Sequence, residues 1–360
     1  MSKNRLHNVL LPTDDERRRI FHWITQISSY TAWKRILDFY ETWTKTAENC
    51  RQLASVSGKE DSSGVSESDY IQCLKGLAHC EDGVLRLSRG DKRIFRYDAN
   101  GEFAMANRPH AYWSNYVVRI EWGEHPAIDD NNTPGWSQFR TAFYALAQAW
   151  GECSDILESR WTDEAAPLSY GNWMRDVLSK MHFPADLAEI PNPEEDVLVY
   201  TGRSIPFSGI WEPVEAPKTN SFSLFRKPQT PKGPFPIVAC MNYLHGGSPA
   251  PQASQETDDD ILQTAVTWRL LWRDTRYEDG SIPAEEESYV FLKPDPAPPS
   301  SSATSFDSAD PFIWSETGYP APQAGRWLAE HDLRASITVK AGELLPMHQG
   351  QVTRWLLAKV

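Results

Sequence analysis

The sequence lacks every short motif that commonly marks a catalytic site. Its 360 residues contain no G-x-S-x-G, H-E-x-x-H, G-x-x-x-x-G-K-[ST] or G-x-G-x-x-G pattern and no protein-kinase signature. These absences remove the usual grounds for predicting a serine hydrolase, a zinc protease, a nucleotide hydrolase or a dinucleotide-dependent enzyme. The sequence therefore offers no motif that predicts catalysis, and we expect no cofactor.

Cysteine is scarce, and long apolar runs are missing. The five cysteines are odd in number and show neither C-x-x-C nor a metal-ligand spacing, which is typical of reduced thiols and predicts no metal site. The apolar run near the N-terminus, VLLP, is too short for the core of a signal peptide. No stretch approaches the length of a transmembrane helix. We expect a cytoplasmic protein that does not contact a membrane.

Positive charge is also in short supply. The chain has 36 Lys and Arg against 49 Asp and Glu, which gives a formal net charge of −13. Sequence-independent binding to nucleic acid needs clustered Lys and Arg, so nucleic acid is not an expected partner. An acidic surface suits a basic protein partner, or solubility alone. Tryptophan, by contrast, is unusually abundant, with 15 copies.

Proline is rare before residue 184, where only five of the 26 prolines lie, and this part shows helical periodicity. Thr13 and Glu16 have the spacing of a capping box at a helix start. From Trp136 to Trp161, large apolar residues recur at spacings of three and four, which predicts one long helix. A further helix is expected at 173–181. Residues 1–190 are therefore expected to form an all-α helical bundle.

The remaining 21 prolines lie at or beyond residue 184, among short runs of β-forming residues. These runs are DVLVY (196–200), SFSLF (221–225), PIVAC (236–240), VTWRLLW (266–272), YVFL (289–292) and ASITV (335–339). Residues 294–316 are rich in Pro and Ser, which indicates a linker or an exposed loop. The expected fold class is α+β, with the helical bundle followed by an antiparallel β region.

One phrase occurs twice in the β region. TGRSIPFSGIW (201–211) and TGYPAPQAGRW (317–327) share the pattern T-G-x-x-x-P-x-x-G-x-W. Its marked positions are Gly202, Pro206, Gly209 and Trp211 in the first copy and Gly318, Pro322, Gly325 and Trp327 in the second. The first Gly allows a turn with positive φ, the Pro stiffens the chain, the second Gly leaves room for backbone, and the Trp anchors a core. We expect scaffold rather than a binding site; exposed tryptophans would instead indicate a ligand platform.

Each copy is expected to open one small antiparallel module, SH3-like or packed as a sandwich. The first module covers 195–293, with an acidic insertion at 245–260, and the second covers 317–360. VTWRLLW (266–272) and VTRWLLA (352–358) are expected to be the matching last strands. The runs SFSLF and ASITV are expected to match each other in the middle of the modules.

The stretch WRDTRYEDGSIPAEEESY (272–289) gathers carboxylates around an Asp-Gly turn, beside aromatic residues. One interpretation is a solvated acidic hairpin. The other is a protein-binding edge, where carboxylates steer a basic partner and aromatic side chains anchor it. The candidate contact residues, including three from the insertion, are Asp258, Asp259, Asp260, Asp274, Tyr277, Glu278, Asp279, Glu285, Glu286 and Glu287.

The β region, with TGRSIPFSGIWEP, VTWRLLWRDTRYEDGSIPAEE and the second G-x-W phrase, resembles immunity proteins of bacterial polymorphic-toxin and type VI secretion systems. The resemblance also covers the Trp-rich helical region. It implies a non-catalytic protein that binds a cognate toxin made by the same cell or its siblings. Such binding blocks the active site of the toxin or its access to substrate. The resemblance transfers no toxin-contact residue.

Three hypotheses about function follow. The first is a cytoplasmic immunity protein that neutralises its toxin by stoichiometric binding, with a homodimer left open. The second is a Trp-rich protein that binds a glycan or a peptide without catalysis. The third is a hydrolase in which carboxylates such as Glu121, Asp274 or Glu278 act as acid and base.

Overall fold

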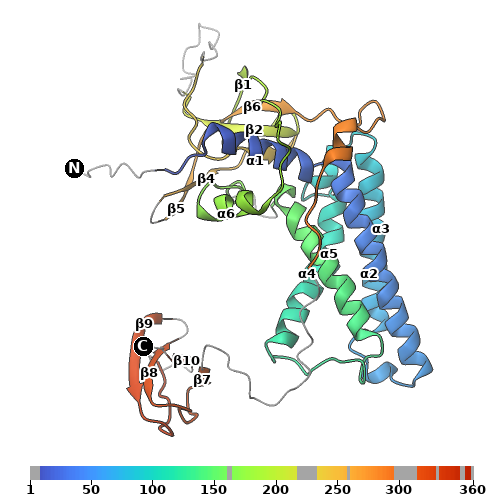
Figure 1. Cartoon of the computed structure of the whole chain (residues 1–360), viewed down its shortest axis with the longest axis vertical. Helices are drawn as coiled ribbons and strands as arrows, with labels where there is room; N and C mark the ends of the chain where they lie inside the picture. Colours follow the sequence, from blue (N-terminus) through green and yellow to red (C-terminus); the bar gives the residue numbers. More distant parts are fainter. Residues whose placement is uncertain are drawn as a thin grey trace. The chain divides into compact units, whose positions relative to one another are not determined.

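The computed structural model describes residues 9–159, 164–216, 233–257, 260–295, 314–329, 332–348 and 353–357. The chain divides into two compact units, residues 1–300 and 301–360, which are taken separately below. Helices in the first part of the described chain are followed by antiparallel sheets (Figure 1), so the α+β prediction is confirmed.

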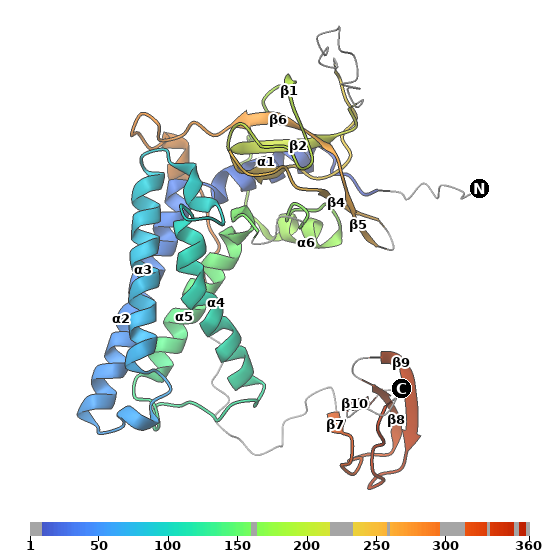
Figure 2. The same ribbon diagram turned by 180° about the vertical axis from the view of Figure 1, so that it is seen from behind.

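The helical part is a bundle built on tryptophan. Its helices are α1 (Asp14–Ile27), α2 (Tyr30–Val56), α3 (Glu67–Leu87), α4 (Glu102–Glu121), α5 (Trp136–Cys153) and α6 (Asn172–Lys180). Helix α2 packs against α3 and α5, and α3 packs against α4, so four long helices lie side by side (Figures 1 and 2). Trp33 stacks on Phe103 with ring centroids 3.9 Å apart, and Trp43, Trp113 and Trp136 are also buried. The abundant tryptophans are therefore mainly core residues.

The helix starts are more predictable than the ends. The capping box at Thr13 and Glu16 is present, as expected. Helix α5 ends at Cys153 and a 3₁₀ turn, η3 (Ser154–Ile156), follows, so the prediction of one helix up to 161 is wrong. The backbone N–H of Glu158 instead donates to the carbonyl of Phe95, 2.9 Å away, which takes the chain out of the helical path.

Two further helical features differ from the sequence analysis. Helix α4 was not expected, and it carries Pro109 in its interior, a residue that normally signals a helix end. Helix α6 was expected, but it buries Met174 and Leu178 while Trp173 is exposed. Of the four apolar residues expected on the buried face of this helix, Leu178 is buried, Val177 and Met181 are partly buried, and Trp173 is exposed.

Two four-stranded antiparallel sheets share one topology. The strands of the larger unit are β1 (Glu194–Tyr200), β2 (Gly209–Val214), β3 (Asn242–Leu244), β4 (Ala253–Glu256), β5 (Ile261–Thr264) and β6 (Thr267–Arg273). Those of the C-terminal unit are β7 (Trp314–Glu316), β8 (Gly325–Ala329), β9 (Asp332–Val339) and β10 (Arg354–Leu357). The strand orders are β1-β6-β2-β3 and β7-β10-β8-β9. In each sheet the last strand therefore lies between the first and the second, and the third strand forms the opposite edge. The repeated phrase thus follows the first strand, β1 or β7, in two copies of one module, here called the first and the second module.

The pairing register fixes which residues of the two modules are equivalent. Trp211 pairs with Leu270 of β6, and Trp327 pairs with Leu357 of β10. The indole N–H of Trp268 donates to the carbonyl of Pro251 at 2.8 Å, and that of Trp355 donates to the carbonyl of Pro346 at 3.0 Å. Trp268 and Trp355 are therefore equivalent, and the expected match of the two VT sequences is wrong by one residue. The alternation of strand side chains decides the register, because both tryptophans must face the interior.

The middle strands also match differently from the prediction. Strand β3 is the counterpart of β9, since Gly209 pairs with Leu244 as Gly325 pairs with Val339. The run SFSLF (221–225) lies outside the described residues, and PIVAC contributes one isolated bridge, from Ile237 to Val214. The run at 289–292 forms no strand, because the carbonyls of Val290 and Leu292 accept hydrogen bonds from side chains of α1 and α2.

The segment after β3 belongs to the repeat rather than to an insertion. Gly247 and Gly342 both have positive φ, 89° and 83°, and each donates its N–H across 2.7 Å to the carbonyl of Ile205 or Ala321. The first module differs from the second by the β4–β5 hairpin that follows, and by a longer connection between its second and third strands, residues 215–241 against residues 330–331. Most of the expected linker at 294–316 lies outside the described residues.

The two modules differ in what covers the outer face of the sheet. In the first module Ile210, Tyr243 and Leu271 belong to the same core as the helices, so this module and the bundle fold as one unit. At the positions of Ile210 and Tyr243 the second module has Arg326 and Thr338, and both are exposed. Its hydrophobic core consists of residues from its own strands and loops. This substitution explains why residues 301–360 form a separate unit.

Candidate interaction surface

The acidic segment 274–287 divides into buried and exposed carboxylates. Asp274 is buried and accepts hydrogen bonds from the hydroxyl of Tyr243 at 2.9 Å and from the guanidinium of Arg276 at 2.8 and 2.9 Å. The ammonium of Lys92 lies 3.5 Å from the same carboxylate. Burial alone would raise the pKa of Asp274, but Arg276 and Lys92 outweigh it and lower the pKa. Asp274 is thus an internal anion.

Arg276 joins this anion to the helices. Its guanidinium donates to the carbonyl of Thr25 at 2.9 Å and to the hydroxyl of Ser28 at 2.7 Å, at the C-terminal end of α1. Burial would lower the pKa of Arg276, whereas the charge of Asp274 raises it, and the net shift is upward. The pair therefore ties the first module to the bundle through charge-assisted hydrogen bonds.

Tyr277 and Glu286 are buried in the same way. The carboxylate of Glu286 accepts from the backbone N–H of Thr31 at 3.0 Å and from its hydroxyl at 2.8 Å, and it also receives the hydroxyl of Tyr277. Tyr277 in turn accepts from the N–H of Tyr30, 2.7 Å away. Glu286 therefore caps the N-terminus of α2, where a negative charge is favourable.

Three of the residues predicted to contact a partner are buried instead. Asp274, Tyr277 and Glu286 are 4%, 1% and 2% exposed, so they belong to the interior. The sequence showed the charge of the segment but not its partners, which come from α1, α2 and the 3₁₀ turn η2 (Lys92–Phe95).

The other carboxylates of the segment reach solvent. They are Glu278, Asp279, Glu285 and Glu287, on the turn and on the 3₁₀ turn η4 (Ala284–Ser288). Asp279 accepts hydrogen bonds from the backbone and the hydroxyl of Ser281, which hold the turn. Glu278 lies against Gly90, where an added Cβ would stand 3.1 Å from the Glu278 backbone. The four residues form an exposed acidic surface, called here the acidic edge.

Of the three contact residues predicted in the insertion, the structure describes one. Asp260 is exposed and accepts from the N–H of Ile261. Asp258 and Asp259 lie outside the described residues.

The phrase residues occupy scaffold positions. Gly202 and Gly318 have φ of 84° and 86°, the turn conformation that favours glycine. A Cβ at Gly209 would lie 2.1 Å from the Trp272 carbonyl, and one at Gly325 would lie 2.5 Å from Leu357. Pro206 and Pro322 are exposed between the turn and the next strand.

Trp211 and Trp327 are both 0% exposed. Neither tryptophan offers an aromatic face for a sugar or a peptide.

The candidate acid–base carboxylates do not converge on one site. Glu121 accepts from Arg140 and from the hydroxyl of Tyr144, each at 2.5 Å. Asp274 is buried on its ion pair, and Glu278 is exposed on the acidic edge. Among the described residues no group of three or more His, Cys, Asp or Glu side chains could hold a metal ion.

A hollow that the sequence did not predict lies where residues 155–159 and 164–167 meet the loop after β3. His245 and Ser248 line it, and the His245 Nδ1 and the Ser248 Oγ are buried without a hydrogen-bond partner. Burial lowers the pKa of His245 to about 4, so its imidazole is neutral near pH 7. Asp155, which also lines the hollow, has its pKa raised by burial. Ordered water would satisfy such groups, and we assign no ligand to them.

Residues 11–167 match the family model of Immunity protein 71, and residues 191–290 match that of Immunity protein 72. The chain joins two immunity-protein regions. The predicted resemblance to immunity proteins is therefore confirmed, and the two matches indicate a toxin-neutralising function. No curated protein and no solved structure matches the chain.

The boundaries of the two regions follow the fold. The Immunity protein 71 region covers α1 to α5 and ends in the segment beside the hollow, while the Immunity protein 72 region covers β1 to β6 and the acidic edge. The second module lies beyond both matches. In the described part of the chain, no helix is both long and apolar enough to cross a membrane.

Proposed function

We propose that this chain is a cytoplasmic, non-catalytic immunity protein that binds one cognate secreted antibacterial toxin and occludes its active site or its substrate. The observation that carries the proposal is the joining of two immunity-protein regions in one chain, through a shared hydrophobic core. The isolated carboxylates and the missing catalytic motifs agree with inhibition by binding rather than by chemistry. Type VI delivery is the route that the resemblance implies for the toxin.

The acidic edge is the proposed site of toxin contact. Glu278, Glu285 and Glu287 are exposed on a segment that Asp274 and Glu286 hold on the bundle. Charges of one sign attract a basic partner and raise the rate of association. The formal net charge of −13 acts in the same direction. A basic surface around the active site of the toxin would complete the fit.

The second hypothesis, glycan or peptide binding through the phrase tryptophans, has less support. It needs aromatic faces in contact with solvent, and both phrase tryptophans are buried. Trp173 and Trp122 are exposed, at 55% and 76%, but Trp173 lies on α6 and Trp122 directly follows α4, both outside the repeat.

The proposal is tested with the toxin encoded next to this chain. Expression of the chain should protect cells that produce the toxin, and the purified pair should form a complex of fixed stoichiometry. Light scattering after gel filtration would show in the same run whether the chain alone is a homodimer. If the chain gives no protection and does not bind that toxin, the proposed function is wrong.

The acidic edge is tested by charge reversal. The triple variant Glu278→Lys, Glu285→Lys, Glu287→Lys leaves the turn residue Asp279 and the buried Glu286 in place. We expect Kd to rise tenfold or more, which is a loss of about 1.4 kcal/mol in binding free energy. We also expect binding to depend less on salt concentration.

The matched control reverses three exposed carboxylates elsewhere, Glu60, Asp61 and Glu67. Equal effects of the two triple variants would show that only net charge matters, and would remove the acidic edge from the proposal.

A further inference from the structure

In the first module, one edge is covered by a short segment from the helical region. This segment is residues 164–168, EAAPL. Ala165 forms a parallel bridge with Gln252, and the N–H of Ala166 donates to the Gln252 carbonyl at 2.8 Å. Ala166 is 2% exposed and belongs to the core of the module. Residues 164–168, here called the covering segment, thus pair with the first module as a very short added strand.

Asn242 fixes the far end of the covering segment. Its side chain accepts from the N–H of Leu168 at 2.8 Å and donates to the Leu168 carbonyl at 3.0 Å. Both groups are buried. The segment is therefore held at two points and is a permanent part of the first module.

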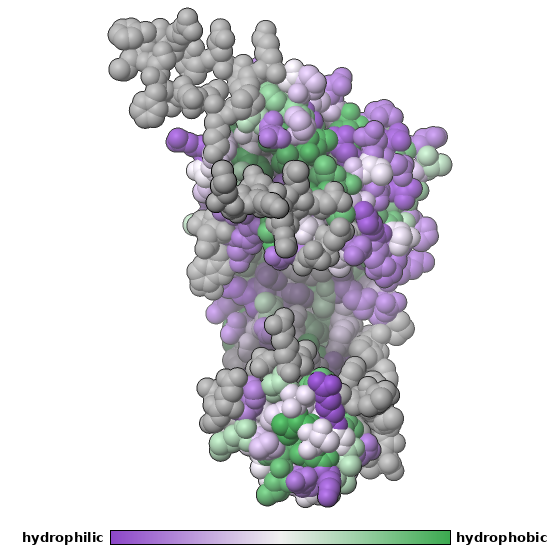
Figure 3. Space-filling view, turned by 90° about the vertical axis from the view of Figure 1, so that its left-hand side faces the viewer, coloured by the Kyte–Doolittle hydropathy of each residue, from purple (hydrophilic) through white to green (hydrophobic). Residues whose placement is uncertain are grey.

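The equivalent edge of the second module is apolar and exposed. The matched registers place Met347 at the position of Gln252, Leu344 at that of Pro249 and Tyr319 at that of Arg203. These three side chains are 60%, 63% and 62% exposed. Hydrophobic side chains reach the surface of the C-terminal unit, the lower body in Figure 3.

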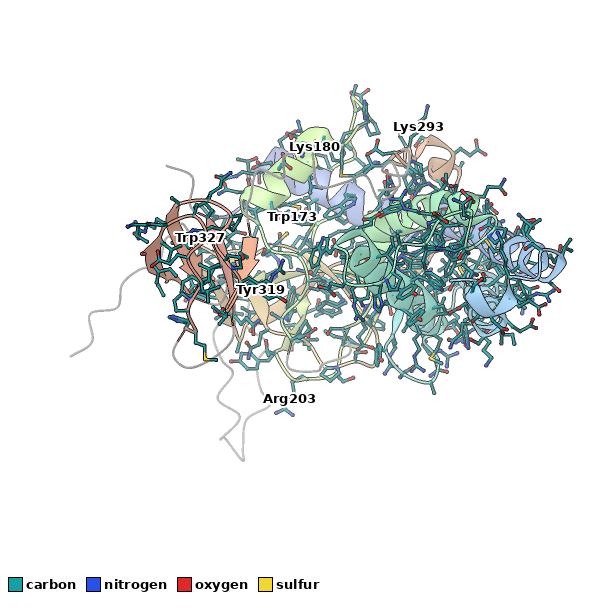
Figure 4. All side chains as sticks on the ribbon, turned by 90° about the horizontal axis from the view of Figure 1, so that it is seen from below. Trp173, Lys180, Arg203, Lys293, Tyr319 and Trp327 are labelled. Carbon is teal, nitrogen blue, oxygen red and sulfur yellow. The ribbon has the colours of Figure 1, made fainter. Side chains whose placement is uncertain are left out.

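The three residues come from neighbouring segments. Pro320 and Leu344 form a bridge, and the N–H of Leu345 donates to the carbonyl of Tyr319 at 3.0 Å. Figure 4 labels Tyr319 together with the core residue Trp327 and with Arg203 of the first module. Among the described residues, none donates a hydrogen bond to the carbonyl of Met347, the acceptor that corresponds to the Gln252 carbonyl. Exposed apolar groups gathered beside this backbone carbonyl mark a candidate interaction site.

We propose that the edge formed by Tyr319, Leu344 and Met347 binds an extended apolar segment of the toxin, which pairs with the Met347 backbone as residues 164–168 pair with Gln252. The inference rests on the proposed function and adds a second contact beyond the acidic edge. It assigns a role to the module that lies outside both immunity-protein matches.

The structure favours another protein over a second copy of this chain as the occupant. The one segment shown to fit this kind of edge, residues 164–168, is already held by Gln252 and Asn242 in its own module. A second copy would have to break those buried hydrogen bonds before it could donate the segment.

The chemistry of the edge indicates what the toxin segment is like. At the position of Asn242 the second module has Ile337, so the amide that binds a backbone is replaced by an apolar side chain. Arg203 and Gln252 are replaced by Tyr319 and Met347. The segment is therefore expected to be extended and to carry larger apolar side chains than the two alanines of EAAPL.

Methyl NMR of the full-length chain provides the direct test. The chain has six methionines, and the ¹³C-methyl resonance of Met347 is assigned with the variant Met347→Leu. The probe is the toxin encoded next to this chain, purified as a catalytically inactive variant. We expect the Met347 resonance to move on binding.

Affinity gives the second readout. The double variant Leu344→Ser, Met347→Ser should raise Kd tenfold or more, whereas the control Val56→Ser, Ile71→Ser, at exposed positions of the bundle, should change it less than twofold. Unchanged indole N–H resonances of Trp327 and Trp355, which lie in the core of the second module, show that the double variant remains folded.

Three results would overturn the inference, and they are distinct from a failure of the proposed function. The toxin binds the wild-type chain while the Met347 resonance stays fixed. The double variant binds as tightly as the control. The Met347 resonance moves with the concentration of the chain alone, which would identify a second copy as the occupant. Absence of any toxin binding by the wild-type chain would instead refute the proposed function itself.

Discussion

Truncation of Glu286 to alanine is expected to destabilise the larger unit severely. The carboxylate is 2% exposed and accepts from the N–H of Thr31 and from the buried hydroxyl of Tyr277, beside the hydroxyl of Thr31. Each stranded donor costs about 1 to 3 kcal/mol. Loss of a negative charge at the start of α2 adds about 0.3 to 1 kcal/mol. The expected cost of Glu286→Ala is therefore about 4 kcal/mol.

Circular dichroism at 222 nm during guanidinium unfolding is the assay, because every described helix lies in the larger unit. With a slope of about 5 kcal/mol per molar denaturant, the midpoint should fall by about 0.8 M. Glu286→Gln keeps the shape and one acceptor, so an intermediate fall is expected. The exposed neighbour Glu285 is the control, and Glu285→Ala should change stability by less than about 0.5 kcal/mol. A Glu286→Ala midpoint equal to that of Glu285→Ala would refute the capping role.

Two further predictions follow from the buried groups. Burial lowers the pKa of His110 to about 4, below the unfolded value near 6.5. The unfolded chain therefore binds a proton first as the pH falls, and about 3 kcal/mol of stability present above pH 6.5 should be lost by pH 4. His110→Gln should flatten this part of a stability profile measured by guanidinium unfolding, and an unchanged profile would assign the loss to other groups. Trp268→Phe and Trp355→Phe each remove a hydrogen bond to a proline carbonyl and should destabilise their own unit by about 1 to 3 kcal/mol. Hydrogen exchange of peptides from 164–295 and 314–357 separates the two effects, and equal deprotection of both regions in either variant would contradict independent folding.

The fold was predictable where local chemistry decides it. Gly202 and Gly318 mark their turns because positive φ favours glycine, and Trp211 and Trp327 mark module cores because an apolar side chain of that size must be covered. The register of the last strands was not predictable from the shared VT letters. It depends on which face of a strand meets the core, and one residue of slip reverses every side chain.

The site was predictable in charge but not in burial. The sequence showed six acidic residues between 274 and 287, all equally plausible at a surface. What buries Asp274 is Arg276 held by the end of α1, and what buries Glu286 is the start of α2, some 250 residues earlier in the chain. Partners at such separations leave no trace in local periodicity. In the sequence alone, a carboxylate that is buried against distant hydrogen-bond donors therefore cannot be told from one exposed to solvent.

The comparison of the two copies recovers some of the information that a single copy hides. An apolar residue in a strand-rich segment normally predicts core, so Leu344 and Met347 taken alone would be assigned to the interior. Their equivalents in the first module, Pro249 and Gln252, border the covering segment and its hollow, which shows that these positions face outward on the shared fold. Apolar side chains at outward positions gain nothing from the module's own core. We infer that a partner covers them, in the way that residues 164–168 pair with Gln252 in the first module.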